Sequence, residues 1–173
     1  DPHTRILKLS QETPSPYLQQ LFRLTPNETL IRLKRLVFTE DSPVVVLSSY
    51  LNPRIYPELQ AGDIDDSLYE ALNRKYGVVP VKARDTYSIV DVSPNTARLL
   101  KCARSASVCF SRRVAYLAGG LAAEYVESFI RSDRFMLDVC IGMDADAEPS
   151  VSPAREEAKK GSLYDVGLRN VFI

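Results

Sequence analysis

Two charged residues stand on strand-like segments whose neighbours would face a hydrophobic core. Side chains alternate between the two faces of a strand, so residues of the same parity share a face. In segment 29–39, Arg35 shares its face with aliphatic residues, namely Ile31, Leu33 and Val37. In segment 121–131, Glu124 is the one carboxylate on a face that otherwise holds Ala122, Val126, Ser128 and Ile130. A guanidinium selects carboxylate or phosphate, and a few polar anchors among apolar residues are typical of a small-molecule site.

The same residues also admit a structural interpretation. Arg35 and Glu124 could form a buried ion pair, or lie near strand ends and reach water. Ser67 stands three residues before Glu70, the spacing of a capping box, and the helix start that it caps also suits an anion. Tyr69 follows on that helix and could equally belong to the core. The residues alone leave these alternatives open.

Composition excludes several classes of function. The 173 residues carry no net charge, and the 22 basic ones are scattered, so this segment alone should bind DNA poorly. The single histidine, His3, argues against a metal site and against Ser-His-Asp catalysis, and we expect no cofactor. Three cysteines without C-x-x-C spacing, no apolar run of about 18 residues and no leader sequence predict a cytoplasmic protein.

Hydrophobic periodicity and turn residues predict an α+β fold, with an antiparallel sheet of about six strands and helices packed on it. Segment 144–161 is predicted to be a flexible tail, and 162–173 an apolar segment that could dock as a strand. The predicted strands are 5–9, 29–39, 44–51, 78–92, 107–116, 121–131 and 134–141, and the predicted helices begin after Ser15, Ser67 and Ser93.

The order and spacing of these pieces resemble a known family. The strand with Arg35 is followed by Ser49-Tyr50-Leu51, then by Asp66-Ser67-Leu68-Tyr69, and then by the stretch from Glu124 to Phe135. Together they make residues 1–143 similar to the UTRA domain, the effector-binding module of the HutC subfamily of GntR-type transcriptional regulators.

The resemblance implies a chorismate-lyase-like fold, a homodimer, and an N-terminal winged helix-turn-helix that is absent from this chain and would contact DNA. It implies a repressor whose DNA binding is modulated by a small effector, such as an organic acid, a phosphonate or a sugar phosphate. It also implies that the effector is contacted at six positions: Arg35, Ser67, Tyr69, Glu124, His3 and Thr4.

Three positions depart from the family pattern. Leu47 stands where many members carry Glu, Val37 where some carry a second Arg, and Ile130 where Tyr precedes the motif Arg. The departures imply a more apolar site, suited to a small or hydrophobic organic acid. We therefore expect a sensor domain and not an enzyme. The alternatives are a chorismate-lyase-like enzyme and a dimerisation module with a vestigial pocket.

Overall fold

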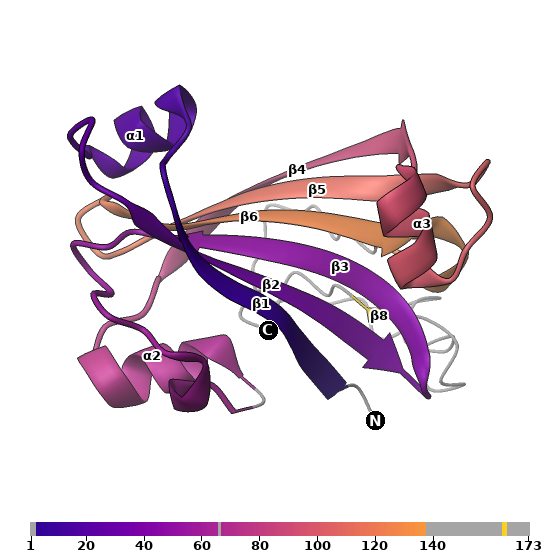
Figure 1. Cartoon of the computed structure of the whole chain (residues 1–173), viewed down its shortest axis with the longest axis horizontal. Helices are drawn as coiled ribbons and strands as arrows, with labels where there is room; N and C mark the ends of the chain where they lie inside the picture. Colours follow the sequence, from indigo (N-terminus) through magenta and orange to yellow (C-terminus); the bar gives the residue numbers. More distant parts are fainter. Residues whose placement is uncertain (1–2, 66, 138–163, 166–173) are drawn as a thin grey trace, which may run out of the picture.

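A six-stranded antiparallel sheet forms the body of the molecule (Figure 1). The computed structural model describes residues 3–65, 67–137 and 164–165. The strands follow the order β1-β2-β3-β6-β5-β4, so the sheet consists of two three-stranded halves joined between β3 and β6. Their bounds are β1 His3–Glu12, β2 Leu30–Thr39, β3 Ser42–Leu51, β4 Lys82–Asp91, β5 Ser107–Tyr116 and β6 Ala122–Arg131.

Each of the three α-helices found among the described residues begins at a serine whose hydroxyl accepts a backbone N–H of the first turn. Helices α1 (Pro16–Phe22) and α3 (Pro94–Leu100) also have proline in the first turn, where its missing N–H costs nothing. Helix α2 (Leu68–Tyr76) ends at Gly77, whose φ of 66° lies in the left-handed region. These caps confirm the three predicted helices.

The helices lie on opposite faces of the sheet. We call the face that carries α2 the first face and the other the second face. Helix α2 packs at one end of the first face, against Ile31, Leu51 and Ala123. On the second face, α1 covers that same end and α3 covers the opposite end, as Figure 1 shows. Side chains in the middle of each face are therefore not committed to packing against a helix.

Two tight turns set the register that decides which residue lies on which face. Glu40 and Asp41, with φ of 47° and 63°, connect β2 to β3, and both adopt the left-handed conformation that suits a two-residue hairpin. Gly119 and Gly120, with φ of 92° and 87°, lie in the turn between β5 and β6. Each turn thus joins two of the predicted strands into an antiparallel hairpin.

The predicted strand 134–141 is confirmed only at two residues of its described part. Residues Ser132–Arg134 form a 3-10 turn, η2, and only Phe135–Met136 are extended, as β7. β7 lies outside the main sheet and pairs in parallel with β8, Tyr164–Asp165. Residues 138–141, the predicted tail 144–161 and most of 162–173 fall outside the described residues.

One residue of the parity prediction is also wrong. Ala122 packs with Leu18 and Phe22 on the second face, not on the face of Glu124. The cause is a β-bulge. Tyr116 pairs with Ala122 and Ala115 pairs with Glu124, so Ala123 has no opposite residue and the alternation slips by one.

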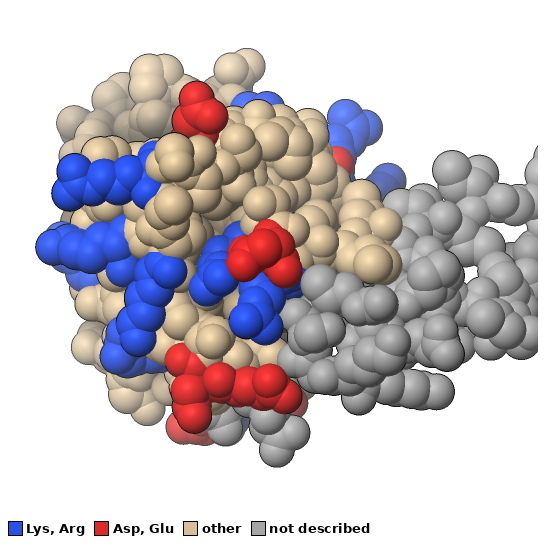
Figure 2. Space-filling model, turned by 90° about the vertical axis from the view of Figure 1, so that its right-hand side faces the viewer, with Lys and Arg blue, Asp and Glu red and all other residues tan. Residues whose placement is uncertain are grey.

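Within the described part of the chain, no helix has the length and hydrophobicity that a membrane crossing requires. Figure 2 views the molecule from the right-hand side of Figure 1 and shows Lys and Arg mainly on the left, with Asp and Glu at the top, at the centre and at the lower edge. The basic side chains visible here are therefore interrupted by acidic ones.

Helix α2 should depend on Leu72, which is fully buried against the sheet. We expect Leu72→Ala to lower the free energy of unfolding by about 2–5 kcal/mol, because it leaves a cavity under the helix. Urea denaturation followed by circular dichroism measures this. Asn73→Ala, at an exposed position of the same helix, is the control and should stay within about 0.5 kcal/mol of wild type.

Candidate functional site

A group of polar and charged side chains occupies the middle of the first face, between two hydrophobic clusters. One cluster lies under α2, and the other includes Val37, Val45 and Ile130 at the opposite end. Cross-strand pairing assigns the polar residues to one face, since directly paired residues point to the same side of a sheet. This central polar patch consists of Arg35, Ser49, Asp85, Ser111, Arg113, Glu124 and Ser128.

Arg35 lies on β2 with only 6% of its surface exposed. Its Nη2 donates a hydrogen bond to the hydroxyl of Ser49 on β3, at 3.2 Å. Ser49 is itself fully buried. The guanidinium of Arg35 is therefore withdrawn from water. In the protein interior, hydrogen bonds to a charged group are stronger than at the surface.

Glu124 is 1% exposed, and Tyr69 of α2 donates its hydroxyl to the Glu124 Oε2 at 2.5 Å. Burial first, and then the neighbouring Glu124 carboxylate, raises the pKa of Tyr69 well above that of a free tyrosine. Tyr69 therefore remains a hydrogen-bond donor throughout the physiological range. This bond joins α2 directly to β6.

Tyr56 adds a hydroxyl to this end of the patch that the sequence did not indicate. Its ring is fully buried in the cluster under α2. Its hydroxyl has no hydrogen-bond partner among the described residues, and its pKa is raised by burial and by the charge of Glu124. Buried hydroxyls are normally paired. A polar group beside Glu124 would satisfy this one.

Arg35 and Glu124 do not form the ion pair that the sequence left open. Arg35 is level with Ser128 on β6, four residues from Glu124, and β3 lies between them. Strand spacing and rise then place their Cα atoms about 16 Å apart, beyond the reach of a direct contact. Both project from the first face. The structure therefore places them on one surface without a direct contact.

Arg113 is a further charged residue of the central polar patch that the sequence analysis did not single out. It lies on β5, and its Nε and Nη2 each donate to a carboxylate oxygen of Asp85 on β4 at 2.7 Å. The side chains are 19% and 14% exposed. Burial is the largest single effect and lowers the pKa of Arg113, but the hydrogen bonds to Asp85 and the charges around the guanidinium, that of Asp85 first, together raise the pKa overall. Parity along 107–116, combined with the hairpin register, would have found it.

The structure places two of the three remaining predicted contact residues near the central polar patch and one away from it. Ser67 caps α2, where its hydroxyl accepts the N–H of Glu70 at 3.4 Å, two residues from Tyr69. Thr4 pairs with Val37 on the first face, one row beyond Arg35. His3 is not brought to the others. Its ring stacks on Phe38, at 4.8 Å between centroids, on the second face.

The departures from the family pattern all lie on the face of the site. Leu47 pairs with Arg35 and with Ser128, while Val37 and Ile130 belong to the hydrophobic cluster beyond them. Arg35 is thus bordered by aliphatic side chains. In the described part of the chain, no three His, Cys, Asp or Glu side chains are grouped as a metal site would require.

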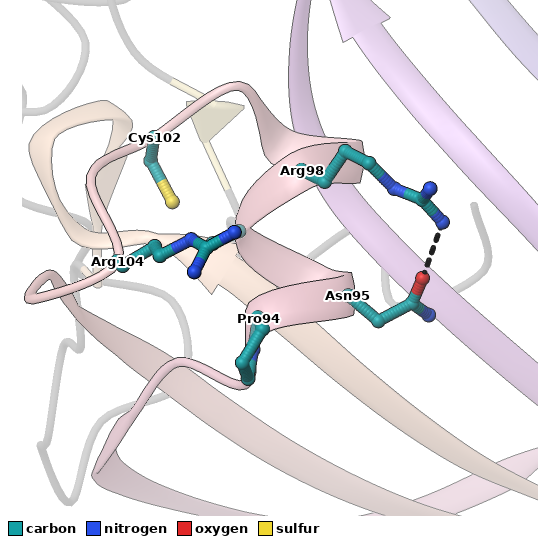
Figure 3. A pocket seen from close by; sticks show the side chains of 6 residues that line it. Pro94, Asn95, Arg98, Cys102 and Arg104 are labelled. Carbon is teal, nitrogen blue, oxygen red and sulfur yellow. Dashed lines mark hydrogen bonds between the residues drawn. The ribbon is translucent and has the colours of Figure 1, made fainter.

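A separate hollow of about 500 Å³ lies beside α3 on the second face (Figure 3). Arg98 donates to Asn95 at 2.8 Å, and Arg104 extends from the following loop toward the helix. Both arginines are exposed, and exposed charges bind partners weakly. The buried charged residues of the first face make the central polar patch the stronger candidate.

The family model described as the UTRA domain matches residues 1–136. This chain belongs to the UTRA domain family. The HTH-type transcriptional repressor NagR of Bacillus subtilis is 26% identical to this UTRA domain over 105 residues, which are 60% of the chain and 43% of NagR. The chain thus spans less than half the length of this curated relative.

Solved structures share the fold of this UTRA domain. The effector domain of PhnF from Mycobacterium smegmatis superimposes with a TM-score of 0.75 at 22% identity, covering 82% of this chain and 88% of that one. A GntR-family transcriptional regulator from Enterococcus faecalis gives 0.72 at 24% identity, covering 80% and 99%. The predicted α+β fold and the predicted family are confirmed.

The two tyrosines beside Glu124 should respond differently to loss of the hydroxyl. Tyr69→Phe removes the donor to a buried carboxylate, so we expect the free energy of unfolding to fall by about 1–3 kcal/mol. Tyr56→Phe is the matched control and should cost far less, because its hydroxyl has no partner among the described residues. Urea denaturation at neutral pH compares them. Equal losses would show that the Tyr69–Glu124 bond contributes nothing.

Tyr69 should also affect stability in alkali. Its pKa is raised in the folded state, whereas an unfolded tyrosine ionises near pH ~10. Above that pH the unfolded chain releases a proton that the folded chain retains, so the free energy of unfolding falls as pH rises. Tyr69→Phe should show a shallower fall between about pH 9 and 11. A curve parallel to wild type would contradict this.

Proposed function

We propose that this UTRA domain is the effector-sensing part of a GntR-type transcriptional regulator and binds a small organic acid on its first face. The observation that carries the proposal is the placement of a buried guanidinium and a buried carboxylate on one face: Arg35 is 6% and Glu124 is 1% exposed. Charges are costly to bury, and buried charged groups are therefore candidates for a functional site.

The anchors suggest how the effector is held. Arg35 offers paired donors for a carboxylate, and Leu47 and Val37 beside it favour an apolar body over a highly charged one. Glu124, with Tyr69 and Tyr56 around it, offers hydrogen bonds to the other end of the ligand. Ser67 and Thr4 are proposed as further contacts, and His3 as a contact only if its ring leaves Phe38.

The DNA-binding function would belong to a part outside this chain. NagR is named as an HTH-type repressor, and the chain spans 43% of its length. We propose a winged helix-turn-helix N-terminal to this domain and a homodimer of the whole regulator. Effector binding would then shift the population of the dimer state that binds DNA, by no more than the difference in effector affinity between the states. We also propose that the domain is not an enzyme.

Melting-temperature shifts across a library of carboxylates, phosphonates and sugar phosphates would identify the effector, because a ligand that prefers the folded state raises the melting temperature. For the best acid found, we expect Arg35→Gln to weaken binding at least about tenfold in calorimetry, through loss of a charged hydrogen bond. Lys34→Gln is the control, since Lys34 precedes Arg35 on β2 and faces the other side.

Unchanged affinity in Arg35→Gln would refute the assigned site. A library without any stabilising compound would favour a dimerisation module. Incubation with chorismate tests the lyase alternative, since Arg113 supplies a second arginine on the same face as Arg35. Formation of 4-hydroxybenzoate would overturn the proposal that the domain is not an enzyme.

A further inference from the structure

The Arg113–Asp85 pair is a doubly hydrogen-bonded charged contact on the first face. Two parallel hydrogen bonds of 2.7 Å join the guanidinium to the carboxylate, and both side chains are mostly buried. Tyr87, two residues after Asp85 on β4, donates to the same carboxylate at 3.2 Å. Asp85 is thus held by two donors, and it fixes the orientation of Arg113.

The pair has a defined position relative to Glu124. Arg113 pairs with Val126 on β6, and Glu124 is two residues along that strand. Diagonal neighbours of this kind lie about 7–8 Å apart. Asp85 is one strand further away, on β4. The positive end of the pair therefore faces Glu124, and the negative end faces the edge of the sheet.

Stability alone does not account for the pair. An ion pair withdrawn from water loses much of its hydration energy, and apolar residues of the same volume often stabilise a fold as well or better. Arg112, the next residue on β5, is exposed on the second face, where a basic side chain costs nothing. The placement of Arg113 beside the proposed site thus requires a different explanation.

We propose that Arg113, oriented by Asp85, is a specificity-determining residue that makes the Glu124 end of the site accept a neutral hydrogen-bond donor and reject an ammonium group. The ligand class is then an acid that carries a hydroxyl or amide N–H at its far end. This inference rests on the proposed function, because it concerns the second end of the same ligand.

The reason is electrostatic. A lone buried carboxylate would favour an ammonium over a hydroxyl, because it gains from a full positive charge. With Arg113 a short distance away, an ammonium at Glu124 would be repelled in surroundings where charges are weakly screened, whereas a neutral donor would not. Arg113 is near enough to Tyr69 for its charge to lower the pKa of that phenol, against the larger effects of burial and Glu124.

Matched pairs of acids test the inference. The probes are ω-hydroxy and ω-amino carboxylic acids of about four to eight carbon atoms, which cover the span between the Arg35 and Glu124 side chains. Calorimetry gives the ratio of the two affinities for each length. We expect wild type to prefer the hydroxy acid at least about tenfold, and Arg113→Gln to lower that ratio by about tenfold or more.

Two further variants keep the outcome interpretable. Arg112→Gln, on the same strand but the opposite face, should leave the ratio unchanged. The double variant Arg113→Gln/Asp85→Asn removes both charges. It serves if the single variant fails to fold, because it leaves no unpaired buried carboxylate. Its ratio should fall like that of the single variant, because the positive end of the pair is gone.

The possible results distinguish the role of Arg113 from the ligand class and from the proposed function. The role of Arg113 is overturned if the affinity ratio is unchanged in the folded Arg113 variants, or if wild type prefers the ω-amino acids. In either case, weaker binding in Arg35→Gln would still support the proposed function. Binding of neither series to wild type shows that the assigned ligand class is wrong. The library screen would then decide the proposed function independently.

Discussion

The hydrogen bond between Tyr69 and Glu124 is the contact on which the organisation of the first face depends. It joins the first turn of α2 to β6, one of the two strands at which the halves of the sheet meet. A carboxylate that is 1% exposed requires such a donor, because its hydration is lost. Helix α2 therefore packs on apolar residues and also supplies the Tyr69 hydroxyl, the hydrogen-bond donor that the buried carboxylate needs.

Charge balance on this face follows from the same constraint. Arg35 and Arg113 are offset by Asp85 and Glu124, so the central polar patch has no formal net charge although all four groups are mostly buried. A balanced but spatially divided patch suits a ligand with two chemically different ends.

Local sequence signals predicted much of this arrangement. Serine caps, Gly77 and the hairpin turns located the helices and two hairpins, and parity placed Arg35 and Glu124 on a buried face. Parity failed at Ala122, because a bulge depends on pairing with a second strand and leaves no local mark. The pairing of Arg113 with Asp85 was missed for a related reason. It joins residues 28 positions apart, and only the register of β4 with β5 brings them together.

The bulge at Ala123 limits how this family member could change in length. Ala122 packs with α1 on the second face, and Glu124 accepts a hydrogen bond from α2 on the first face. A single residue without a partner on β5 lies between them. Losing one residue at this point would move either the alanine or the carboxylate to the wrong side. Insertions and deletions should therefore collect in the turn around Gly119 and Gly120, where an added residue leaves both contacts in place.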